Sequence, residues 1–308
     1  MAYKSAKSDA PKMDVYQVVT DKLIEMLEGC KGDNYQIPWN RVGNNLMPRN
    51  VVSKKTYRGV NTVLLWLTSE AMGYTSDLWA TYKQWADLGA QVRKGEKGTQ
   101  IVFWKAFTVE SQDGDEDSEK KGMIARVYTV FNAMQVDGYA LPNTAPKFSN
   151  NNEKIERVEQ YFANVGSIVR HGGDRAYYRP SGDFIGMPEM NQFKDSVSYY
   201  AVRAHEEVHR TGHESRLKRE FNNRFGTEAY AFEELVAELG AAFLCAELEL
   251  SSEPRKDHAQ YLASWLKVLR KDKKALISAA SMAQKAVDYL NSCQPATVNA
   301  SLDMAEAA

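Results

Sequence analysis

The chain has 308 residues, 44% hydrophobic and 26% charged, a composition typical of a globular protein large enough for two domains. It contains no apolar run near the roughly 20 residues of a membrane-spanning helix, and no apolar core of a secretory signal near its start. Its three widely spaced cysteines argue against a disulfide framework and against cysteine as a metal ligand, so we expect a cytoplasmic protein with reduced thiols.

The net charge of −1 is unevenly distributed along the chain. Residues 36–105 hold ten Lys/Arg against four Asp/Glu, which is +6 and leaves −7 for the remaining residues. A basic stretch joined to an acidic remainder predicts a module that faces a polyanion and a second module with a different role.

The first half combines helices with a β-hairpin. After a leader over residues 1–12 that we expect to be disordered, residues 14–29 carry apolar side chains at helical spacing. Residues 57–74 begin extended and become helical, and residues 81–105 combine a short helix, a basic turn and a strand. The apolar runs 99–109 and 123–136 predict a hairpin whose loop is the acidic stretch 110–122.

Aromatic and cationic residues are interleaved in this half. Binding of single-stranded nucleic acid requires cations that contact phosphates and flat rings on which bases stack. The candidate contacts are Trp39, Arg41, Arg49, Lys54, Lys55, Tyr57, Arg58, Tyr82, Lys83, Arg93, Lys94 and Lys97. The alternative is that the rings belong to the core and the cations are solvated. We favour the core for Trp66, Phe103 and Trp104, which lie in apolar runs, whereas the two interpretations are evenly matched for Trp39, Tyr57 and Tyr82.

A stretch rich in Pro, Asn and Ser, residues 141–154, separates the two halves. We therefore expect a first domain over 13–142, a linker over 143–153, a second domain over 154–290 and a flexible tail over 291–308. Early in the second domain, residues 176–188 predict two short strands around a Pro-Ser-Gly turn. We expect residues 183–187 to form an edge strand beside a cleft that accepts an extended peptide.

The helical pattern of residues 194–213 contains the sequence HEEVH. A spacing of four places His205 and His209 one turn apart on the same side, where both imidazoles can bind one metal ion. Glu206 then points toward the open side of the metal, as the general base for a bound water must. The alternative is two surface histidines beside a glutamate by accident, and such a motif arises in about one chain of this length in a hundred.

Zinc requires a third protein ligand. Ser215 occupies the position at which the pattern HExxHxxGxxH requires histidine, and His213 is the nearest substitute. The apolar helix expected over residues 229–250 offers carboxylates instead. We assign Glu234 as the third ligand and Glu238 as an acceptor for the other N–H group of a ligand histidine, with Glu233 as the competing ligand. Two histidines and a carboxylate accept Zn²⁺, Mn²⁺ or Co²⁺.

Several segments resemble one protein family. YQIPWN, NVVSKKTYRGVNTVLL and WATYKQWADLGAQVRKGEKGTQIVFWK resemble the N-terminal domain of ArdC-type antirestriction proteins of conjugative plasmids. AHEEVHRTGHESRL and YAFEELVAELGAAFL are similar to the zincin-like metallopeptidase domain of that family. The resemblance runs from about Met13 to about Leu290. It implies an α+β fold in which an α/β single-stranded DNA-binding domain precedes a mostly helical zincin-like domain with a small sheet.

The resemblance also implies a role. It implies protection of incoming plasmid DNA from host restriction enzymes, and a relation to modules of plasmid TraC primases. Residue by residue, His205, His209 and Glu234 match the metal ligands of the family and Glu206 matches its catalytic glutamate. Two functions stay open: an antirestriction protein that binds single-stranded DNA and carries a metal site, or an active zinc metallopeptidase recruited to DNA to cleave restriction enzymes or other DNA-bound proteins. A third hypothesis treats both halves as assembly surfaces.

Overall fold

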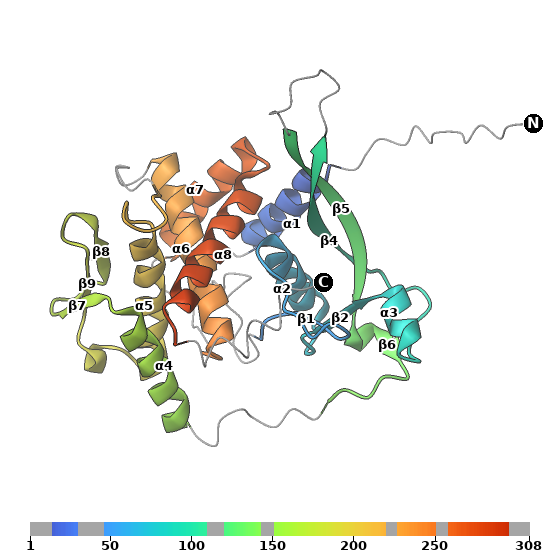
Figure 1. Ribbon diagram of the computed structural model, residues 1–308, viewed down its shortest axis with the longest axis horizontal. Helices are drawn as coiled ribbons and strands as arrows, with labels where there is room; N and C mark the ends of the chain where they lie inside the picture. The colour runs from blue at the N-terminus through green and yellow to red at the C-terminus, as the bar shows by residue number, and fades with distance from the viewer. Residues whose placement is uncertain are drawn as a thin grey trace, which may run out of the picture.

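A computed structural model describes residues 14–29, 46–109, 120–142, 151–219, 227–250 and 258–295. The chain forms two domains that combine helices with β-sheets, as the sequence predicts. Figure 1 shows the C-terminal helices and a small sheet on one side of the molecule and a long β-ribbon on the other, with α1 between them. None of the described helices is long and apolar enough to cross a membrane.

The N-terminal domain contains a four-stranded sheet with the strand order β1-β2-β5-β4. The strands are β1 (Arg49–Asn50), β2 (Leu78–Thr81), β4 (Thr99–Val109) and β5 (Lys120–Asn132). The helices of this domain are α1 (Val15–Gly29), α2 (Val60–Met72) and α3 (Tyr82–Asp87). The short strands β3 (Gln91–Val92) and β6 (Val136–Asp137) form a separate antiparallel pair. The expected helix over 14–29 and the expected hairpin are confirmed.

The hairpin of β4 and β5 differs from its prediction at both ends of β5. Its loop is shorter than the expected 110–122, because β5 begins at Lys120, opposite Val109. The strand ends at Asn132 rather than at residue 136. The Asn132 side chain accepts a hydrogen bond from the Met134 N–H, and the Gln135 side chain accepts one from the Asn132 N–H. This reciprocal capping starts a 3₁₀ turn that stops the strand.

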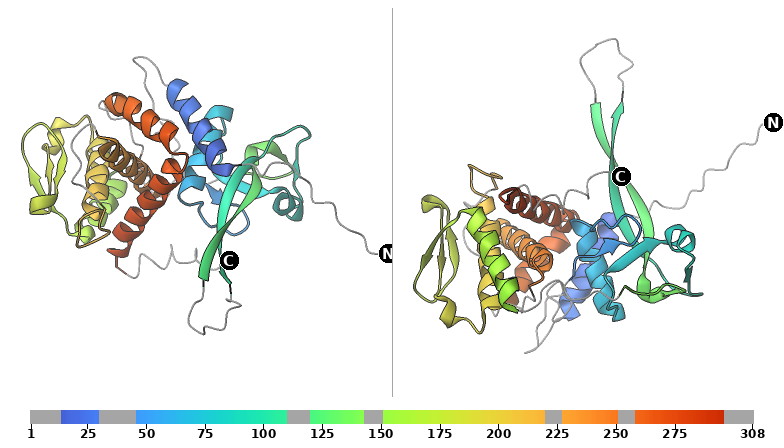
Figure 2. Two further views of the ribbon diagram at one scale, coloured as in Figure 1. Left: turned by 90° about the horizontal axis from the view of Figure 1, so that it is seen from above. Right: turned by 60° about the horizontal axis from the view of Figure 1, so that its bottom comes forward.

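The ribbon exposes side chains that the sequence predicts to be buried. Phe103 is 49% exposed and Trp104 is 38% exposed, whereas Trp66 is buried as expected. The strand β2 pairs only with residues 130–132 of β5, so β4 and β5 continue beyond it as two strands. Figure 2 shows this ribbon projecting from the body of the molecule. An apolar run therefore does not imply burial here, because no third strand continues alongside it.

The C-terminal domain is a group of helices with a three-stranded sheet at one side (Figure 1). The helices are α4 (Asn151–Val165), α5 (Ser196–Thr211), α6 (Glu228–Glu247), α7 (His258–Lys271) and α8 (Ala275–Ser292). The strands are β7 (Ile168–His171), β8 (Tyr177–Arg179) and β9 (Phe184–Met187). The first turn of α4 thus lies inside the segment 143–153 expected as a linker, and α8 extends two residues past position 290.

The expectation that residues 183–187 form an edge strand is wrong. The strand β9 lies in the centre of the sheet, parallel to β7 on one side and antiparallel to β8 on the other. The sequence interpretation recognised the β8–β9 pair but not β7, which follows α4 and covers the other edge of β9. Both edges of β9 are therefore occupied by neighbouring strands, and the described structure leaves no room for a peptide to add there.

The two domains share an apolar core. Leu23 and Leu27 of α1 and Trp66 of α2 are buried in the same cluster as Phe243 of α6 and Leu276 of α8. The rings of Trp66 and Phe243 lie 5.7 Å apart. Full burial of side chains of this size is worth about 1.5–3 kcal/mol each, so the contact between the domains is a substantial part of the stability of both.

Polar groups join the small sheet to the end of α5. Asp183, in the left-handed region with φ of 45°, accepts a hydrogen bond of 2.9 Å from Arg216, which follows α5. The Tyr178 hydroxyl donates to the same carboxylate at 2.9 Å, and Arg216 also donates to the Arg210 carbonyl at 2.7 Å. The Arg216 hydrogen bond outweighs partial burial and lowers the pKa of Asp183 to about 2.

We expect Asp183→Asn to lower the melting temperature at pH 7 by roughly 2–4 °C, because a partly exposed charged hydrogen bond of this kind is worth about 1 kcal/mol. The folded pKa is below the unfolded value, so the stabilisation is complete above about pH 4 and is lost as the pH falls toward 2. Thermal unfolding between pH 7 and pH 2 measures this difference. The exposed Asp174, replaced by Asn, is the control. A difference from the native protein that does not shrink below pH 4 contradicts the role of the Asp183 carboxylate.

Candidate metal centre

The candidate site depends on a close contact between α5 and α6. A Cβ atom added to Gly240 of α6 would lie 2.8 Å from Cγ2 of Val208. Val208 is fully buried on α5, directly before His209. Only glycine allows the two helices to approach this closely at the contact. The approach brings the histidines of α5 within reach of the glutamates of α6.

Three side chains converge between these helices. The Nε2 atoms of His205 and His209 lie 3.1 Å apart. The Glu234 carboxylate lies 3.6 Å from Nε2 of His205 and 3.5 Å from Nε2 of His209. Ligands of a tetrahedral zinc ion, each about 2.0–2.1 Å from the metal, are roughly 3.3–3.4 Å apart. In the described part of the chain this is the one group of three or more His, Cys, Asp or Glu side chains close enough to hold a metal ion. The residues therefore fit such an ion.

A carboxylate lies beside the other nitrogen of each histidine. The Glu238 carboxylate lies 3.1 Å from Nδ1 of His205, and the Glu233 carboxylate lies 3.2 Å from Nδ1 of His209. A carboxylate at Nδ1 fixes the proton there and leaves Nε2 available to a metal. Glu233 faces the outer side of His209, whereas Glu234 faces both Nε2 atoms. The geometry thus favours Glu234 over Glu233 as a ligand.

Arg219 is a further residue of the site, and it was not identified from the sequence. Its guanidinium donates to Glu233 at 3.0 Å, to the Val208 carbonyl at 2.6 Å and to the Thr211 hydroxyl at 2.8 Å. It thereby joins the last turn of α5 to the first half of α6. A lone arginine after a helix carries no spacing signal, so only the fold reveals its contacts.

The site favours a cation. Burial raises the pKa of Glu234, but hydrogen bonds from His205 and His209 outweigh it and hold that pKa below its ordinary value. Burial also raises the pKa of Glu233, and hydrogen bonds from His209 and Arg219 again outweigh it. Burial disfavours the charged form of His209, yet the two carboxylates raise its pKa. Ionised carboxylates beside imidazoles are the donor set of a divalent metal ion.

Two other sequence candidates differ in their placement. Glu206 directly follows His205 on α5 and is buried, with 3% of its surface exposed. His213 lies beyond the end of α5, where its Nδ1 contacts the Ser215 hydroxyl at 2.8 Å. It does not belong to the group of donors around Glu234.

The candidate DNA contacts fall into three groups. Trp39 and Arg41 lie outside the described residues. Three arginines pair with carboxylates, namely Arg49 with Asp77, Arg58 with Asp288 and Arg93 with Glu96. Arg58 and Arg93 are exposed in spite of these pairs. The other exposed candidates are Tyr82, which is 52% exposed, and the lysines Lys54, Lys83, Lys94 and Lys97, while Lys55 is half-buried.

Tyr57 requires a correction. It is 6% exposed and packs in a core cluster with Leu65 and Trp79, and burial raises its pKa. It therefore offers no face to a base in this structure. The sequence places Tyr57 beside Arg58, but its ring packs among side chains of α2 and of the four-stranded sheet.

The ribbon supplies exposed rings, among them Phe103, which the sequence assigned to the core. Phe103 and Tyr128 are 49% and 42% exposed, and their ring centroids lie 5.5 Å apart. Arg126 pairs with Phe103 across the ribbon, so all three side chains lie on one face. The sequence alone does not identify them, because an apolar run looks the same whether or not a third strand continues beside it.

The comparisons with known proteins agree with this architecture. Residues 13–131 match the family described as the N-terminal domain of anti-restriction factor ArdC, and residues 156–282 match the family described as a zincin-like metallopeptidase. The crystal structure of the metal-free antirestriction protein ArdC from the R388 plasmid is 39% identical, with a TM-score of 0.75. The match covers 91% of this chain and 98% of that chain. The chain belongs to the ArdC family.

Other ArdC relatives add to this placement. A Mn(II)-bound structure of ArdC from the R388 plasmid is 38% identical, with a TM-score of 0.73 and the same coverage. The uncharacterized protein y4eC of Sinorhizobium fredii is 47% identical over 289 residues, which are 91% of this chain and 92% of y4eC. A DNA primase TraC of Escherichia coli is 40% identical over 298 residues, 91% of this chain but only 20% of the primase. The ArdC-like region is thus a small part of that primase.

We expect metal content to distinguish the donors of this ArdC-family site. His205→Ala and Glu234→Ala each remove one of three ligands and should abolish the bound metal, whereas Glu206→Gln should retain it. Glu238→Ala should weaken metal binding by about 10–100-fold, the usual loss when the support of a ligand histidine is removed. Metal per chain after dialysis, measured by elemental analysis, tests each variant.

The matched controls for this experiment are Glu233→Ala and His213→Ala. His213→Ala should leave metal content unchanged, and Glu233→Ala should behave like Glu238→Ala because both carboxylates hold an Nδ1 atom. Full metal content in Glu234→Ala, with complete loss in either control variant, contradicts the assignment of Glu234.

Proposed function

We propose that this chain binds single-stranded DNA and protects incoming plasmid DNA from host restriction. The similarity to the R388 antirestriction protein, which extends over 98% of that chain, carries the proposal. The exposed lysines of the N-terminal domain and the rings of Tyr82, Phe103 and Tyr128 support it, because they provide phosphate contacts and stacking surfaces. The restriction enzymes themselves, or other proteins on DNA, are the further partners of this proposal.

We also propose that His205, His209 and Glu234 bind a divalent metal ion, Zn²⁺ being favoured by the two imidazoles and single carboxylate and Mn²⁺ or Co²⁺ being accepted. A metal ion held there supplies Lewis-acid chemistry. The chain supplies the remaining groups: Glu238 and Glu233 orient the two imidazoles, and Glu206 is enclosed where its carboxylate can accept a proton. The burial of the site among apolar helices restricts access of water.

We expect the full-length protein to bind single strands more tightly than duplex of the same length, with little preference for sequence. Affinity should fall steeply with salt concentration because phosphate contacts release counterions. Fluorescence anisotropy with labelled oligonucleotides at 50–200 mM salt measures both effects on the full chain, since α1 and α2 share a core with the C-terminal helices.

A ribbon variant with both Phe103→Ala and Tyr128→Ala tests the contribution of the exposed rings. Its control is Met134→Ala, which replaces an exposed apolar residue that follows β5. The ribbon variant should lose affinity at every salt concentration and the Met134 variant should not. Equal or tighter binding of duplex in the native protein contradicts the proposed preference.

The second candidate function is an active zinc metallopeptidase that cleaves proteins on DNA. The observation in its favour is the group of three donors with a carboxylate beside each Nδ1 atom, on a helix that also carries the buried Glu206. Structural zinc sites are closed by four protein ligands, whereas catalytic sites have three and an open position. The described residues provide three.

Glu206→Gln separates the two functions, because it keeps the size and polarity of the side chain but cannot accept a proton as a base. If the protective role does not use peptide cleavage, transfer of unmodified plasmid DNA into a restricting host should be protected equally by the native protein and by this variant. Loss of protection in Glu206→Gln with normal metal content and normal DNA affinity favours the peptidase. His205→Ala serves as the metal-free control in the same assay.

A further inference from the structure

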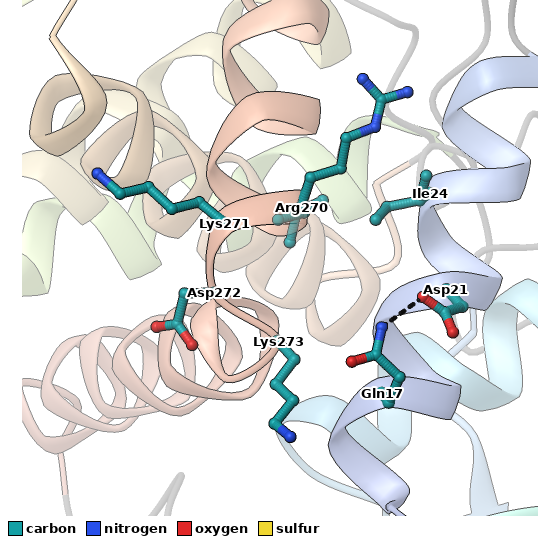
Figure 3. Close-up of a pocket in the computed structure, with 8 residues that line it drawn as sticks. Gln17, Asp21, Ile24, Arg270, Lys271, Asp272 and Lys273 are labelled. Atoms are coloured by element: carbon teal, nitrogen blue, oxygen red, sulfur yellow. Dashed lines mark hydrogen bonds between the residues drawn. The ribbon is translucent and has the colours of Figure 1, made fainter.

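A pocket lies on the surface where the two domains meet. Its volume is about 380 Å³, and it lies between α1 and the end of α7, lined by Gln17 and Asp21 on one side and by Arg270, Lys271 and Lys273 on the other. Figure 3 shows the side chains of Gln17 and Asp21 facing Lys273 across this space. None of the metal-site residues lines it, so its chemistry is separate from that of the metal centre.

The chain is strongly basic at this point. Between Lys267 and Lys274 there are five cations and one carboxylate, a net charge of +4 within the half of the sequence that is acidic. The five cations are Lys267, Arg270, Lys271, Lys273 and Lys274. The side chains of the first four are 45–70% exposed, with Lys273 the least exposed and Lys267 the most.

An aromatic pair adjoins these cations. The Lys274 ammonium lies 5.7 Å from the centre of the Tyr16 ring on α1. The Tyr16 ring in turn lies 5.8 Å from the ring of Trp104 on β4, which is 38% exposed. Three elements thus contribute to one continuous surface: the β4–β5 ribbon, the start of α1 and the turn after α7. Rings and cations alternate along it as they do on surfaces that bind single-stranded nucleic acid.

The simplest alternative is that these cations only pair with carboxylates of the protein. Lys273 contacts Asp14, Lys271 contacts Glu228 and Arg270 contacts Glu28. Exposed pairs of this kind contribute only about 0–1 kcal/mol each, so a phosphate can take the place of a carboxylate at little loss. Lys274 differs from the other three because it lies over the ring of Tyr16.

We propose that the basic segment 267–274 of the C-terminal domain, together with Tyr16 and Trp104, forms part of the binding site for single-stranded DNA. The lysines contact phosphates and Trp104 offers a face to a base. This inference rests on the proposed DNA-binding function and extends the site across the domain boundary. The N-terminal domain alone then holds only part of the site.

The position of this surface relative to the metal centre follows from the fold. Lys271 contacts Glu228, the first residue of α6, and Glu234 lies six residues further along the same helix. Six residues of an α-helix span about 9 Å along its axis. A DNA strand bound to the basic segment therefore lies near the N-terminal half of α6, which contains the metal-site carboxylates.

The test replaces Lys271 and Lys274 together by Gln in the full-length protein and measures anisotropy with a labelled oligothymidylate. Each lost phosphate contact lowers the slope of log affinity against log salt by about 0.7 for a single strand. The slope should therefore fall by roughly 1.4, and affinity at 0.1 M salt should fall on the order of tenfold. Arg175→Gln is the control for loss of a surface cation elsewhere, because Arg175 is exposed in the turn between β7 and β8 on the far side of the molecule (Figure 1).

A second variant tests the ring. Trp104→Ala should weaken binding about fivefold or more with an unchanged salt slope, because stacking does not release counterions. Trp104→Phe should restore most of the affinity. Metal content should remain normal in every variant, and Lys271→Arg with Lys274→Arg should bind as the native protein does, which separates lost contacts from lost folding.

The outcomes distinguish this inference from the function on which it rests. If the native protein does not bind the oligonucleotide, the proposed DNA-binding function fails. If the native protein binds and the Lys271/Lys274 Gln variant matches Arg175→Gln in affinity and salt slope, the inference is overturned while the proposed function stands. The same result would indicate that the basic segment serves an acidic protein partner instead.

Discussion

The packing of α5 against α6 is the contact on which the rest of the C-terminal domain depends. Gly240 lets Val208 approach so closely that histidines and glutamates from two helices share one enclosed space. Four glutamates, Glu206, Glu233, Glu234 and Glu238, are each at most 8% exposed there. Buried carboxylates are unfavourable unless cationic or hydrogen-bonding partners meet them. A helix pair that was even slightly further apart would leave these carboxylates buried but without their partners.

The buried charges of the site also explain why residues outside the motif matter. The Nδ1 atoms of both histidines face carboxylates, and one of these carboxylates is held by Arg219. Arg219 also donates a hydrogen bond to the carbonyl of Val208, the residue at the close contact of the helices. The helix contact and the orientation of His209 therefore depend on each other. Any shift of α5 along α6 changes packing, hydrogen bonding and the positions of the donor atoms together.

The sequence predicts the three converging side chains and one of the carboxylates beside them, Glu238, but not the remaining contacts of the site. The spacing of His205 and His209 follows from helical geometry alone, and an isolated carboxylate such as Glu238 in an apolar helix indicates a buried partner, so these residues could be predicted. Arg219 and the contact of Glu233 with His209 could not, because they depend on how the chain turns after α5. Trp104, which the sequence assigned to the core, is partly exposed, and Tyr57, for which core and surface were evenly matched, is buried. Whether a ring is covered depends on which strands and helices continue beside it, and local composition does not contain that information.

The net charge of each half of the sequence does not predict the charge of its exposed surface. Residues outside 36–105 carry −7 in total, yet they include the +4 of the segment 267–274. The carboxylates that make this half acidic include the buried glutamates of α5 and α6, which face histidines and arginines rather than water. The shared core of α1 and α2 with α6 and α8 then brings the basic segment beside the rings of the ribbon. Folding thus encloses many of the acidic groups and leaves the basic segment exposed beside Tyr16, whose ring adjoins Trp104, although the three lie far apart in sequence.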